Sequence, residues 1–297
     1  MPEYKDHTPV LTKEVLQYLD VQPDENVIDG TVGNAGHAKL LLEKNSPFGK
    51  LLGIDADAGQ IANARRQTHE FNERIILVND SYANIKEIVE RVRLKPIHAI
   101  LLDLGYSSWH MAQSGKGFSF LKDEPLDMRY GSGELTATKI VNEYKEKELE
   151  HIISEYGEEK YAKQVARFIV RHRKAGEIKS TFDLVAVIEE AIGQKYRSQN
   201  IHCATRTFQA LRIAVNGELD NVQKVLPQAL EILAPGGRLA VVSFHSLEDR
   251  IVKNFFKQEE QRGGVIVLTK KPVEALDGEV LENPRSRSAK LRVIKKV

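Results

Sequence analysis

The sequence predicts an α/β fold in which a mostly parallel sheet is interrupted by a helical insertion. Between residues 26 and 105, short apolar runs alternate with segments that have helical spacing and length. From 139 to 200 the pattern favours several helices with no strand between them, and strand character returns at residue 238. Because continuous apolar strands separated by helices are typical of a doubly wound parallel sheet, the two strand-bearing parts are expected to form one domain.

The first part of this domain supplies four strands and the helices that connect them. The strands are expected at 26–29, 51–55, 75–78 and 98–103, and the helices at 36–44, 57–70 and 82–93. Residues 106–133 are rich in Gly, Ser and charge, so they are expected to form a loop ahead of the inserted helices.

The second part resumes the sheet after one or two helices over 205–233, which end at the helix breaker Ala234-Pro235-Gly236-Gly237. A strand over 238–244 and a helix over 246–258 follow, with Ser246 and Asp249 at the spacing of a capping box. The last two runs, 265–269 and 291–295, are expected to form an antiparallel pair at the edge.

These elements predict a seven-stranded sheet, the usual core of class I methyltransferases. The core would comprise residues 1–112 and 205–297, with residues 113–204 as an inserted helical domain. Dehydrogenase sheets usually lack the final antiparallel pair, although likeness of fold alone does not decide function.

The composition is that of a globular protein with no global preference for nucleic acid. Of 297 residues, 41% are hydrophobic and 29% are charged, and the net charge of +1 means that any basic surface must be local. Cys203 is the only cysteine, which excludes an internal disulfide and a Cys-rich metal site, and no metal is expected. The chain has no apolar run of membrane-spanning length and no signal-peptide pattern, so we expect a cytoplasmic protein with no membrane partner.

The stretch "DGTVGNAGH", residues 29–37, joins the first strand to a helix and is the candidate ligand-binding turn. The N-terminus of that helix offers free N–H groups and the positive end of a dipole. The turn lacks GxGxxG and the P-loop lysine, so it leaves a nicotinamide cofactor or S-adenosylmethionine (AdoMet) as candidates. Asp55, at the end of the second strand, would bind the ribose of either. In the alternative reading, Asp57 caps the next helix and Asp55 is only a loop residue.

The fourth strand ends in "LLDLGYSS", residues 101–108, which places Asp103 at the same edge of the sheet. An exocyclic amine of a base is a poor nucleophile because its lone pair is delocalised into the ring. A carboxylate that accepts its hydrogen would help the nitrogen to pyramidalise toward a methyl donor, mainly through positioning and electrostatics. Alternatively, Asp103 only caps a turn.

Further motifs extend along the whole chain. They are "HTPVL" (7–11), "GFSF" (117–120), "PLDMR" (125–129), "ATRTFQALRIAVNGEL" (204–219), "PGGRLAVVSFHSLEDRIVK" (235–253) and "NPRSRSAKLR" (283–292). Together with the two stretches above, in this order and spacing, they resemble the RsmH (MraW) family of methyltransferases. The resemblance implies a class I methyltransferase core with an inserted substrate-recognition domain. It also implies transfer of a methyl group from AdoMet to N4 of cytidine 1402 of 16S rRNA, in the decoding region of the small ribosomal subunit.

The resemblance also implies roles for individual residues. Asp103 and Asp127 would be catalytic, and the cofactor would contact Ala35, Gly36, His37, Asp55, Tyr82, Asp103 and His110. Three of these depart from the usual family residue. Tyr82 replaces Phe and can still stack on adenine, and Ala35 replaces Gly, which is tolerable only if its φ is negative. His110 replaces Gln and cannot reproduce both functions of the amide.

Several other residues have two readings. Tyr106 could stack on cytosine, as in DNA amino-methyltransferases, but a small apolar residue is usual there. Cys203 could be the thiolate of a C5-methylation mechanism, but proline is usual at its position, which favours a bystander. Asp127 either holds the cytosine amine or pairs with Arg129, Asn216 either lines the site or braces a helix, and His245 lies at the ligand edge.

Two basic clusters are candidates for RNA contact. From Lys160 to Lys174 there are six Lys or Arg residues and no acid, and most have the spacing of one helix face. From Arg285 to Lys296 there are again six, alternating with apolar residues in a strand. The rival readings are an NAD(P)-dependent oxidoreductase and a catalytically silent RNA-binding protein. A homodimer is compatible with the sequence.

Overall fold

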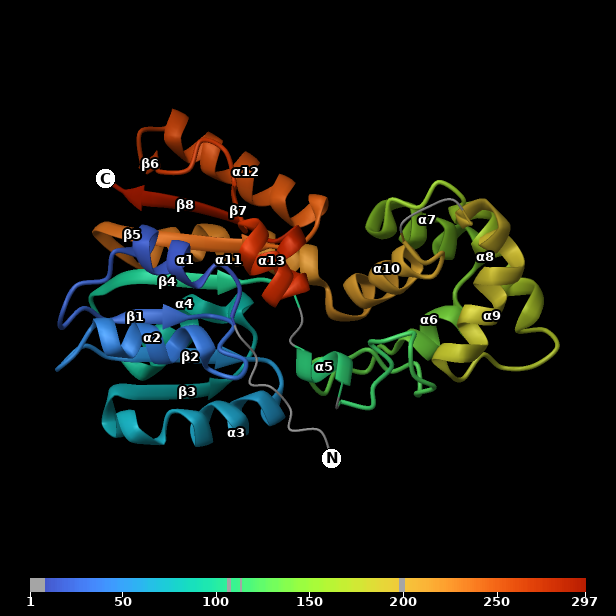
Figure 1. Cartoon of the computed structure of the whole chain (residues 1–297), viewed down its shortest axis with the longest axis horizontal. Coiled ribbons are helices and arrows are strands. Elements are labelled where there is room, and N and C mark those ends of the chain that lie inside the picture. Colours follow the sequence, from blue (N-terminus) through green and yellow to red (C-terminus); the bar gives the residue numbers. More distant parts are fainter. Residues whose placement is uncertain (1–8, 106–107, 113, 198–200) are drawn as a thin grey trace. The chain divides into compact units, whose positions relative to one another are not determined.

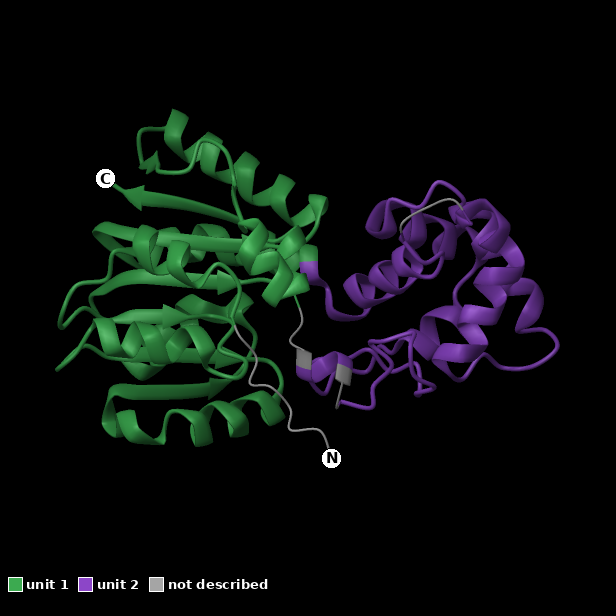
Figure 2. Ribbon diagram, in the orientation of Figure 1, with its two compact units in different colours: residues 1–105, 219–297 green, residues 106–218 purple. Residues whose placement is uncertain are grey.

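The chain forms two compact units (Figures 1 and 2). The computed structural model describes residues 9–105, 108–112, 114–197 and 201–297. Unit 1 comprises residues 1–105 and 219–297, and unit 2 comprises residues 106–218. None of the helices in the described residues is both long and apolar enough to cross a membrane.

Unit 1 is built on one mixed sheet in the order β3-β2-β1-β4-β5-β8-β6, with the two-residue strand β7 also paired with β8. The first five strands in this order are parallel, and β8 runs antiparallel to β5, β6 and β7. The sheet therefore has eight strands rather than the expected seven. The strands are β1 (Val27–Asp29), β2 (Leu51–Asp55), β3 (Ile75–Asn79), β4 (Ile97–Asp103), β5 (Leu233–Ser243), β6 (Val265–Val267), β7 (Val273–Glu274) and β8 (Lys290–Lys296).

Helices cover both faces of this sheet because its strands are apolar on both sides (Figure 1). In β4, Ile100 and Leu102 pack into one apolar cluster, whereas Ala99 and Leu101 pack into another on the opposite face. The first cluster includes residues of α4 (Ile85–Val92), α11 (Glu218–Ile232) and α12 (Ser246–Gln261). The second includes residues of α1 (Thr12–Leu19), α2 (Gly36–Lys44) and α3 (Ala58–Gln67). The helix α13 (Asp277–Glu282) and the short 3-10 helices η1 (His69–Arg74), η2 (Tyr82–Asn84) and η4 (Pro284–Ser288) complete the unit.

The predicted helix breaker at residues 234–237 lies within β5 rather than ahead of it. Residues Ala234–Gly237 are an irregular part of β5, where the pairing with β4 shifts between Ile97↔Leu233 and Ala99↔Arg238. The regular strand therefore begins at Arg238, as expected. Upstream, the predicted helical stretch is two helices, because Gly217 ends the first with a φ of 59°.

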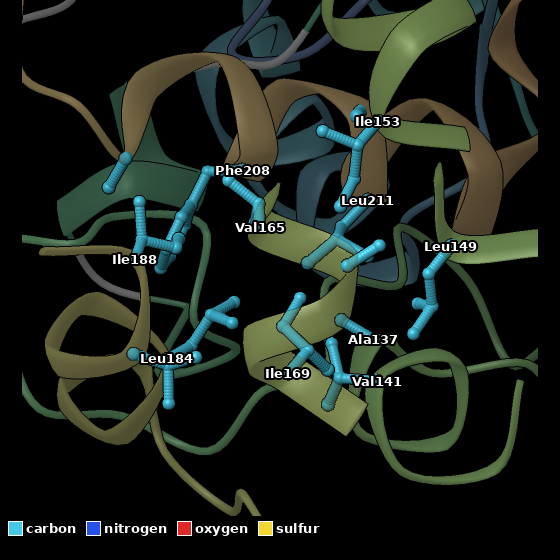
Figure 3. Packing of buried hydrophobic residues seen from close by; sticks show 14 of the residues in the cluster. Ala137, Val141, Leu149, Ile153, Val165, Ile169, Leu184, Ile188, Phe208 and Leu211 are labelled. Atoms are coloured by element: carbon cyan, nitrogen blue, oxygen red, sulfur yellow. The ribbon is translucent and has the colours of Figure 1, made fainter. Parts of the chain in front are cut away.

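Unit 2 is a helical bundle with its own core (Figure 3). Its helices are α5 (Ser108–Ala112), α6 (Ala137–Glu143), α7 (Glu146–Gly157), α8 (Ala162–His172), α9 (Thr181–Ile192), η3 (Gly193–Tyr196) and α10 (Thr205–Asn216). Phe208 and Leu211 of α10 are buried with Ile153 of α7 and Val165 of α8 in this core. The unit boundaries therefore lie at 105/106 and 218/219. We expected them at 112/113 and 204/205, but the apolar face of α10 is buried within the bundle.

Candidate active site at the carboxyl edge of the sheet

Four polar residues lie at the carboxyl ends of neighbouring parallel strands. Asp29 ends β1, Asp55 ends β2, Asn79 ends β3 and Asp103 ends β4. In the sheet order β3-β2-β1-β4, the chain reverses its direction of winding between β1 and β4. Open α/β sheets bind ligands outside the carboxyl ends of the strands at such a switch point. The candidate site is therefore this edge of unit 1.

Asp55 fixes the shape of the turn that follows β1. One carboxylate oxygen accepts a hydrogen bond from the N–H of Gly33 at 3.0 Å, and the other accepts from the N–H of Asp57 at 2.9 Å. Asp57 caps α3 by accepting from the N–H of Gly59 at 2.7 Å. The alternative reading of Asp57 is thus confirmed, but Asp55 is more than a loop residue. Each of its oxygens can accept a second hydrogen bond, so binding of a ribose hydroxyl stays a prediction.

Ala35 has the left-handed backbone conformation, with a φ of 62°, so our expectation of a negative φ is wrong. The turn requires this conformation because the N–H of Ala35 donates to the carbonyl of Val32 at 2.7 Å. The carbonyl of Ala35 then accepts from the N–H of Lys39 at 3.0 Å as α2 begins. A left-handed alanine costs roughly 1–2 kcal/mol, which explains why glycine is the easier residue for this position. Gly36, the next residue, packs against Pro9: an added Cβ would lie 3.0 Å from its Cγ.

His37 and Asp103 face each other across the site. His37 lies in the first turn of α2 and is buried, and its Nε2 is 3.7 Å from Oδ2 of Asp103. The other oxygen of Asp103, Oδ1, is buried and accepts no hydrogen bond from the described residues. The backbone N–H of Asp103 donates to Oγ1 of Thr31 at 2.7 Å, which fixes the end of β4 against the turn.

Burial raises the pKa of the Asp103 carboxyl well above its usual value. The negative charges of Asp29 and Glu248 raise it further, whereas the positive charge of Arg285 opposes them. Asp103 is therefore a carboxyl group that can hold a proton, with one buried oxygen available as an acceptor.

Tyr82 lies beside this turn. It opens the short helix η2 after β3, is half-buried, and packs against the apolar cluster that includes Ile85 and Ile88. An added Cβ on Gly30 would lie 3.6 Å from the Cβ of Tyr82, which places the tyrosine next to the first residue of the turn. The structure thus brings the six expected cofactor residues of unit 1 to one edge of the sheet.

His110, the seventh expected cofactor residue, belongs to unit 2 and lies in an aromatic cluster. Its ring centroid is 5.1 Å from those of Phe118 and Tyr130, and the latter two rings stack 5.4 Å apart. The His110 side chain is buried. These contacts give it a packing role, and its contact with a cofactor stays a prediction.

Asp127 forms the ion pair that was its alternative reading. The guanidinium of Arg129 donates to both carboxylate oxygens of Asp127, each at 2.7 Å. Burial alone would raise the pKa of Asp127, but the hydrogen bonds and charge of Arg129 lower it below its usual value. The group is therefore held ionised, and a catalytic role for it stays a prediction.

Asn216 braces the loop that carries Asp127. Its amide oxygen accepts from the N–H of Tyr130 at 2.9 Å, and its amide nitrogen donates to the carbonyl of Met128 at 2.8 Å. Asn216 therefore has a bracing role, but it braces this loop and not only a helix as expected. Next to it, Arg212 pairs with Glu218 through two hydrogen bonds of 2.9 Å, an interaction that the sequence pattern did not reveal.

The start of α12 differs from the predicted capping box. The N-cap of α12 is His245, whose side chain accepts from the N–H of Glu248. The predicted capping box of Ser246 and Asp249 is therefore wrong. Asp249 instead accepts two hydrogen bonds from Arg292, at 2.6 and 3.0 Å, so this residue of the C-terminal basic cluster is part of the fold.

The remaining candidates are Cys203 and Tyr106. Cys203 is buried, and burial raises the pKa of its thiol, with the charge of Glu189 adding to the effect. Tyr106 lies outside the described residues. Sequence reasoning gave no role to Asp29, Thr31, Glu248 or Arg285. An acid at the very end of a buried strand was the signal available for Asp29.

Comparison with known proteins identifies the family to which the chain belongs. Residues 4–297 match the model of the MraW methylase family. The chain is 44% identical to "Ribosomal RNA small subunit methyltransferase H" of Heliobacterium mobile, over 98% of this chain and 99% of that protein. It is 45% identical to the protein of the same name from Geobacter sulfurreducens, over 98% and 99%. Among solved structures, a methyltransferase homologue from Pyrococcus horikoshii matches with a TM-score of 0.45 and 15% identity, over 96% of this chain and 66% of that one.

Proposed function

Because the chain belongs to the MraW methylase family, and is therefore an AdoMet-dependent rRNA methyltransferase, we propose that it methylates N4 of a cytidine in the small ribosomal subunit. The proposed target is cytidine 1402 of 16S rRNA, in the decoding region. Because the chain belongs to this family, the alternative functions of an oxidoreductase and of a catalytically silent RNA-binding protein are set aside. The observation that carries the proposal is the buried Oδ1 of Asp103, in the motif "LLDLGYSS", which accepts no hydrogen bond from any residue that the structure describes.

The residues at the sheet edge fit AdoMet. When bound, AdoMet supplies a methyl group on a positively charged sulfonium, and the carboxylates of Asp29, Asp55 and Asp103 give this edge a negative character suited to a cation. Asp55 would hold the ribose and Tyr82 would stack on the adenine. The N-terminus of α2 at Gly36 would meet the carboxylate of the methionine part.

Asp103 would act on the nucleobase amine. Its Oδ1 accepts no hydrogen bond from the described residues, and accepting one from the amine would localise the lone pair of the nitrogen for attack. Its raised pKa suits an acceptor that takes the proton as the amine loses it. His37, 3.7 Å away, is placed to stabilise the ionised carboxylate before transfer.

The environment of Cys203 supports amine rather than ring-carbon chemistry. Methylation at C5 of cytosine needs a thiolate that attacks the ring, whereas burial and the charge of Glu189 favour the protonated thiol here. Cys203 belongs to the apolar core of unit 2 with Ala204 and Phe208. The thiol is therefore better explained by packing.

We expect Cys203→Ser to keep at least half of the methylation rate, because N4 transfer needs no covalent adduct between enzyme and base. The measurement is initial-rate methylation of small subunits at matched protein concentration, after circular dichroism has shown that the variant is folded. Loss of activity in a folded Cys203→Ser protein, or a covalent complex with RNA containing 5-fluorocytidine, would favour C5 chemistry instead.

Unit 2 offers a basic surface for the RNA, which we call the α8 face and define as Lys160, Lys163, Arg167, Arg171 and Lys174. All five side chains are exposed. The three lysines form no ion pair with other described residues, and Arg171 lies 5.8 Å from the centre of the Phe168 ring. Arg167 is weakly paired with Glu146 at 3.8 Å. A cationic face beside a half-buried aromatic ring suits the phosphates of single-stranded RNA.

Arg173 shows which basic residue of this segment is structural. Its guanidinium donates to the carbonyl of Val141 at 2.8 Å, which ties the end of α8 to α6. It is therefore excluded from the α8 face and should be left intact in any charge-reversal experiment.

We expect the double reversal Lys163→Glu/Arg171→Glu to weaken binding of small-subunit rRNA and to reduce the slope of log Kd against log salt by ~1.5–2, with AdoMet affinity unchanged. The measurement is rRNA binding over a salt series, with AdoMet calorimetry on the same samples. The matched control is Lys253→Glu/Lys257→Glu, which makes the same change of charge on two exposed lysines of α12 in unit 1. If both double variants lose affinity equally, the α8 face is only a solvated surface.

The proposed target nucleotide is tested by mapping the methyl group. Small subunits from cells that lack this activity are incubated with the protein and AdoMet carrying a CD₃ group, and rRNA digests are analysed by mass spectrometry. We expect the labelled mass only in the decoding-region oligonucleotide that contains cytidine 1402. A label confined to another oligonucleotide would overturn the assignment of the target but not the reaction class.

A further inference from the structure

We propose that Asp29 determines cofactor specificity: with Asp103 it makes the site favour cationic AdoMet over its neutral product, S-adenosylhomocysteine, increasingly so as pH rises. The inference rests on the proposed placement of the cofactor at the edge of the sheet. It gives a specific role to Asp29, which is treated above only as one of the acids that make this edge negative.

Asp29 is a buried carboxyl group in the middle of the sheet edge. Its side chain is 2% exposed, and its strand neighbours in register are Gly53 of β2 and Leu101 of β4. Oδ1 accepts a hydrogen bond from the N–H of Thr31 at 3.1 Å. Among the described residues, no Lys, Arg or His forms an ion pair with Asp29. A buried acid without a cation is costly to ionise, so this position invites a positively charged ligand.

Thr31 connects Asp29 to Asp103. Its N–H donates to Asp29, and its hydroxyl oxygen accepts from the N–H of Asp103 at 2.7 Å. The two carboxyl groups thus end adjacent parallel strands at the point where ligands enter such sheets. The charged or titratable groups around the pair are Asp55 of β2, Glu248 of α12, His37 of α2 and Arg285 of η4.

Around Asp29 and Asp103, the negative charges raise the pKa values more than the positive charge of Arg285 lowers them. Burial raises the pKa of Asp29 to about 7, and the charge of Asp55 adds to this against the hydrogen bonds from Thr31. Burial likewise raises the pKa of Asp103, with Asp29 and Glu248 adding to it and Arg285 opposing. Near neutral pH, a substantial fraction of the ligand-free protein therefore carries a proton on this pair.

The sign of the pH effect follows from charge. A nearby cation favours the ionised carboxylate and lowers its pKa, so AdoMet binding below about pH 7 requires release of a proton. Above that pH the proton is already absent, and AdoMet affinity is greater. S-adenosylhomocysteine has the same ribose, adenine and amino-acid groups but no sulfonium, so its affinity gains less. Alkaline pH therefore favours exchange of product for substrate.

The experiment is calorimetric titration of the wild-type protein with AdoMet and with S-adenosylhomocysteine across neutral pH. We expect the ratio of dissociation constants, product over substrate, to rise ~5-fold from about pH 6 to about pH 8. In buffers of different ionisation enthalpy, AdoMet should release more protons than the product does. Asp29→Asn, which keeps the oxygen that accepts from Thr31, should reduce the rise of the ratio with pH, and the rise that remains belongs to Asp103.

Two outcomes separate this inference from the placement of the cofactor. A pH-independent ratio in the wild-type protein overturns the inference, and this measurement needs no variant. If Asp55→Ala weakens both ligands in that case, the cofactor placement stands alone. If neither Asp55→Ala nor Asp29→Asn changes the affinity of either ligand, the cofactor does not bind at this edge of the sheet. The inference about Asp29 is then wrong as well.

Discussion

Asp103→Asn is expected to lower the single-turnover methylation rate at saturating AdoMet by ~10²-fold or more, the scale for a positioned proton acceptor. The amide is close in size to the carboxylate, so the N–H of Asp103 can keep its bond to Thr31 and the end of β4 stays in place. What is lost is the negative charge and the capacity to take a proton from the amine. A smaller increase in the AdoMet dissociation constant is also expected, because the carboxylate lies at the cofactor edge.

Rapid-quench kinetics with labelled AdoMet separates the two effects. A variant that binds AdoMet weakly but keeps its saturated rate would show that Asp103 acts mainly on the cofactor. A variant with both quantities unchanged would reduce Asp103 to a structural cap. The control is Asp20→Asn, which removes an exposed carboxylate that pairs with Arg238.

Arg212→Met is expected to destabilise the protein by about 3–5 kcal/mol. The Arg212 and Glu218 side chains are 11% and 6% exposed. The substitution leaves the carboxylate of Glu218 buried without its cation, although it still accepts a hydrogen bond from the Tyr130 hydroxyl at 2.8 Å. An uncompensated buried charge is far more costly than the pair. The measurement is urea unfolding followed by circular dichroism.

Two further variants make this prediction specific. Arg212→Met/Glu218→Leu should recover most of the lost stability, because removing both charges leaves none unpaired. Arg262→Met removes the partner of Glu259 from a pair in which Arg262 is 72% exposed, and should cost less than about 1 kcal/mol. A loss of under 1 kcal/mol for Arg212→Met itself would show that water reaches Glu218.

The α/β core was predictable because its strands are buried on both faces and therefore form short continuous apolar runs. The ends of these strands placed Asp55 and Asp103 correctly at one edge. The boundary of unit 2 was not predictable, because the amphipathic pattern of α10 shows that one face is buried without showing what covers it. The two-residue strand β7 is likewise too short to have a pattern of its own.

The hydrogen bonds and ion pairs of the polar side chains were harder to predict than the places of these residues in the fold. Asp127 and Arg129 are two residues apart, so their ion pair was a natural alternative, whereas Arg292 finds Asp249 across 43 residues. Ser246 and Asp249 have capping-box spacing, but the helix starts one residue earlier than that pattern requires, with His245 as the N-cap. The φ of Ala35 was also not predictable from the residue type. The hydrogen bonds of the turn set this angle, and the residue type decides only how much free energy the left-handed conformation costs.

The central claim is that a methyl group passes from AdoMet to the exocyclic amine of a cytidine. The direct measurement uses small subunits whose cytidines carry ¹⁵N at the amine, together with AdoMet carrying a CD₃ group, followed by digestion to nucleosides and fragmentation in the mass spectrometer. We predict N4-methylcytidine in which the CD₃ group and the ¹⁵N atom leave in the same fragment. A CD₃ group retained on the ring carbon of 5-methylcytidine, or on the ribose, would contradict the account.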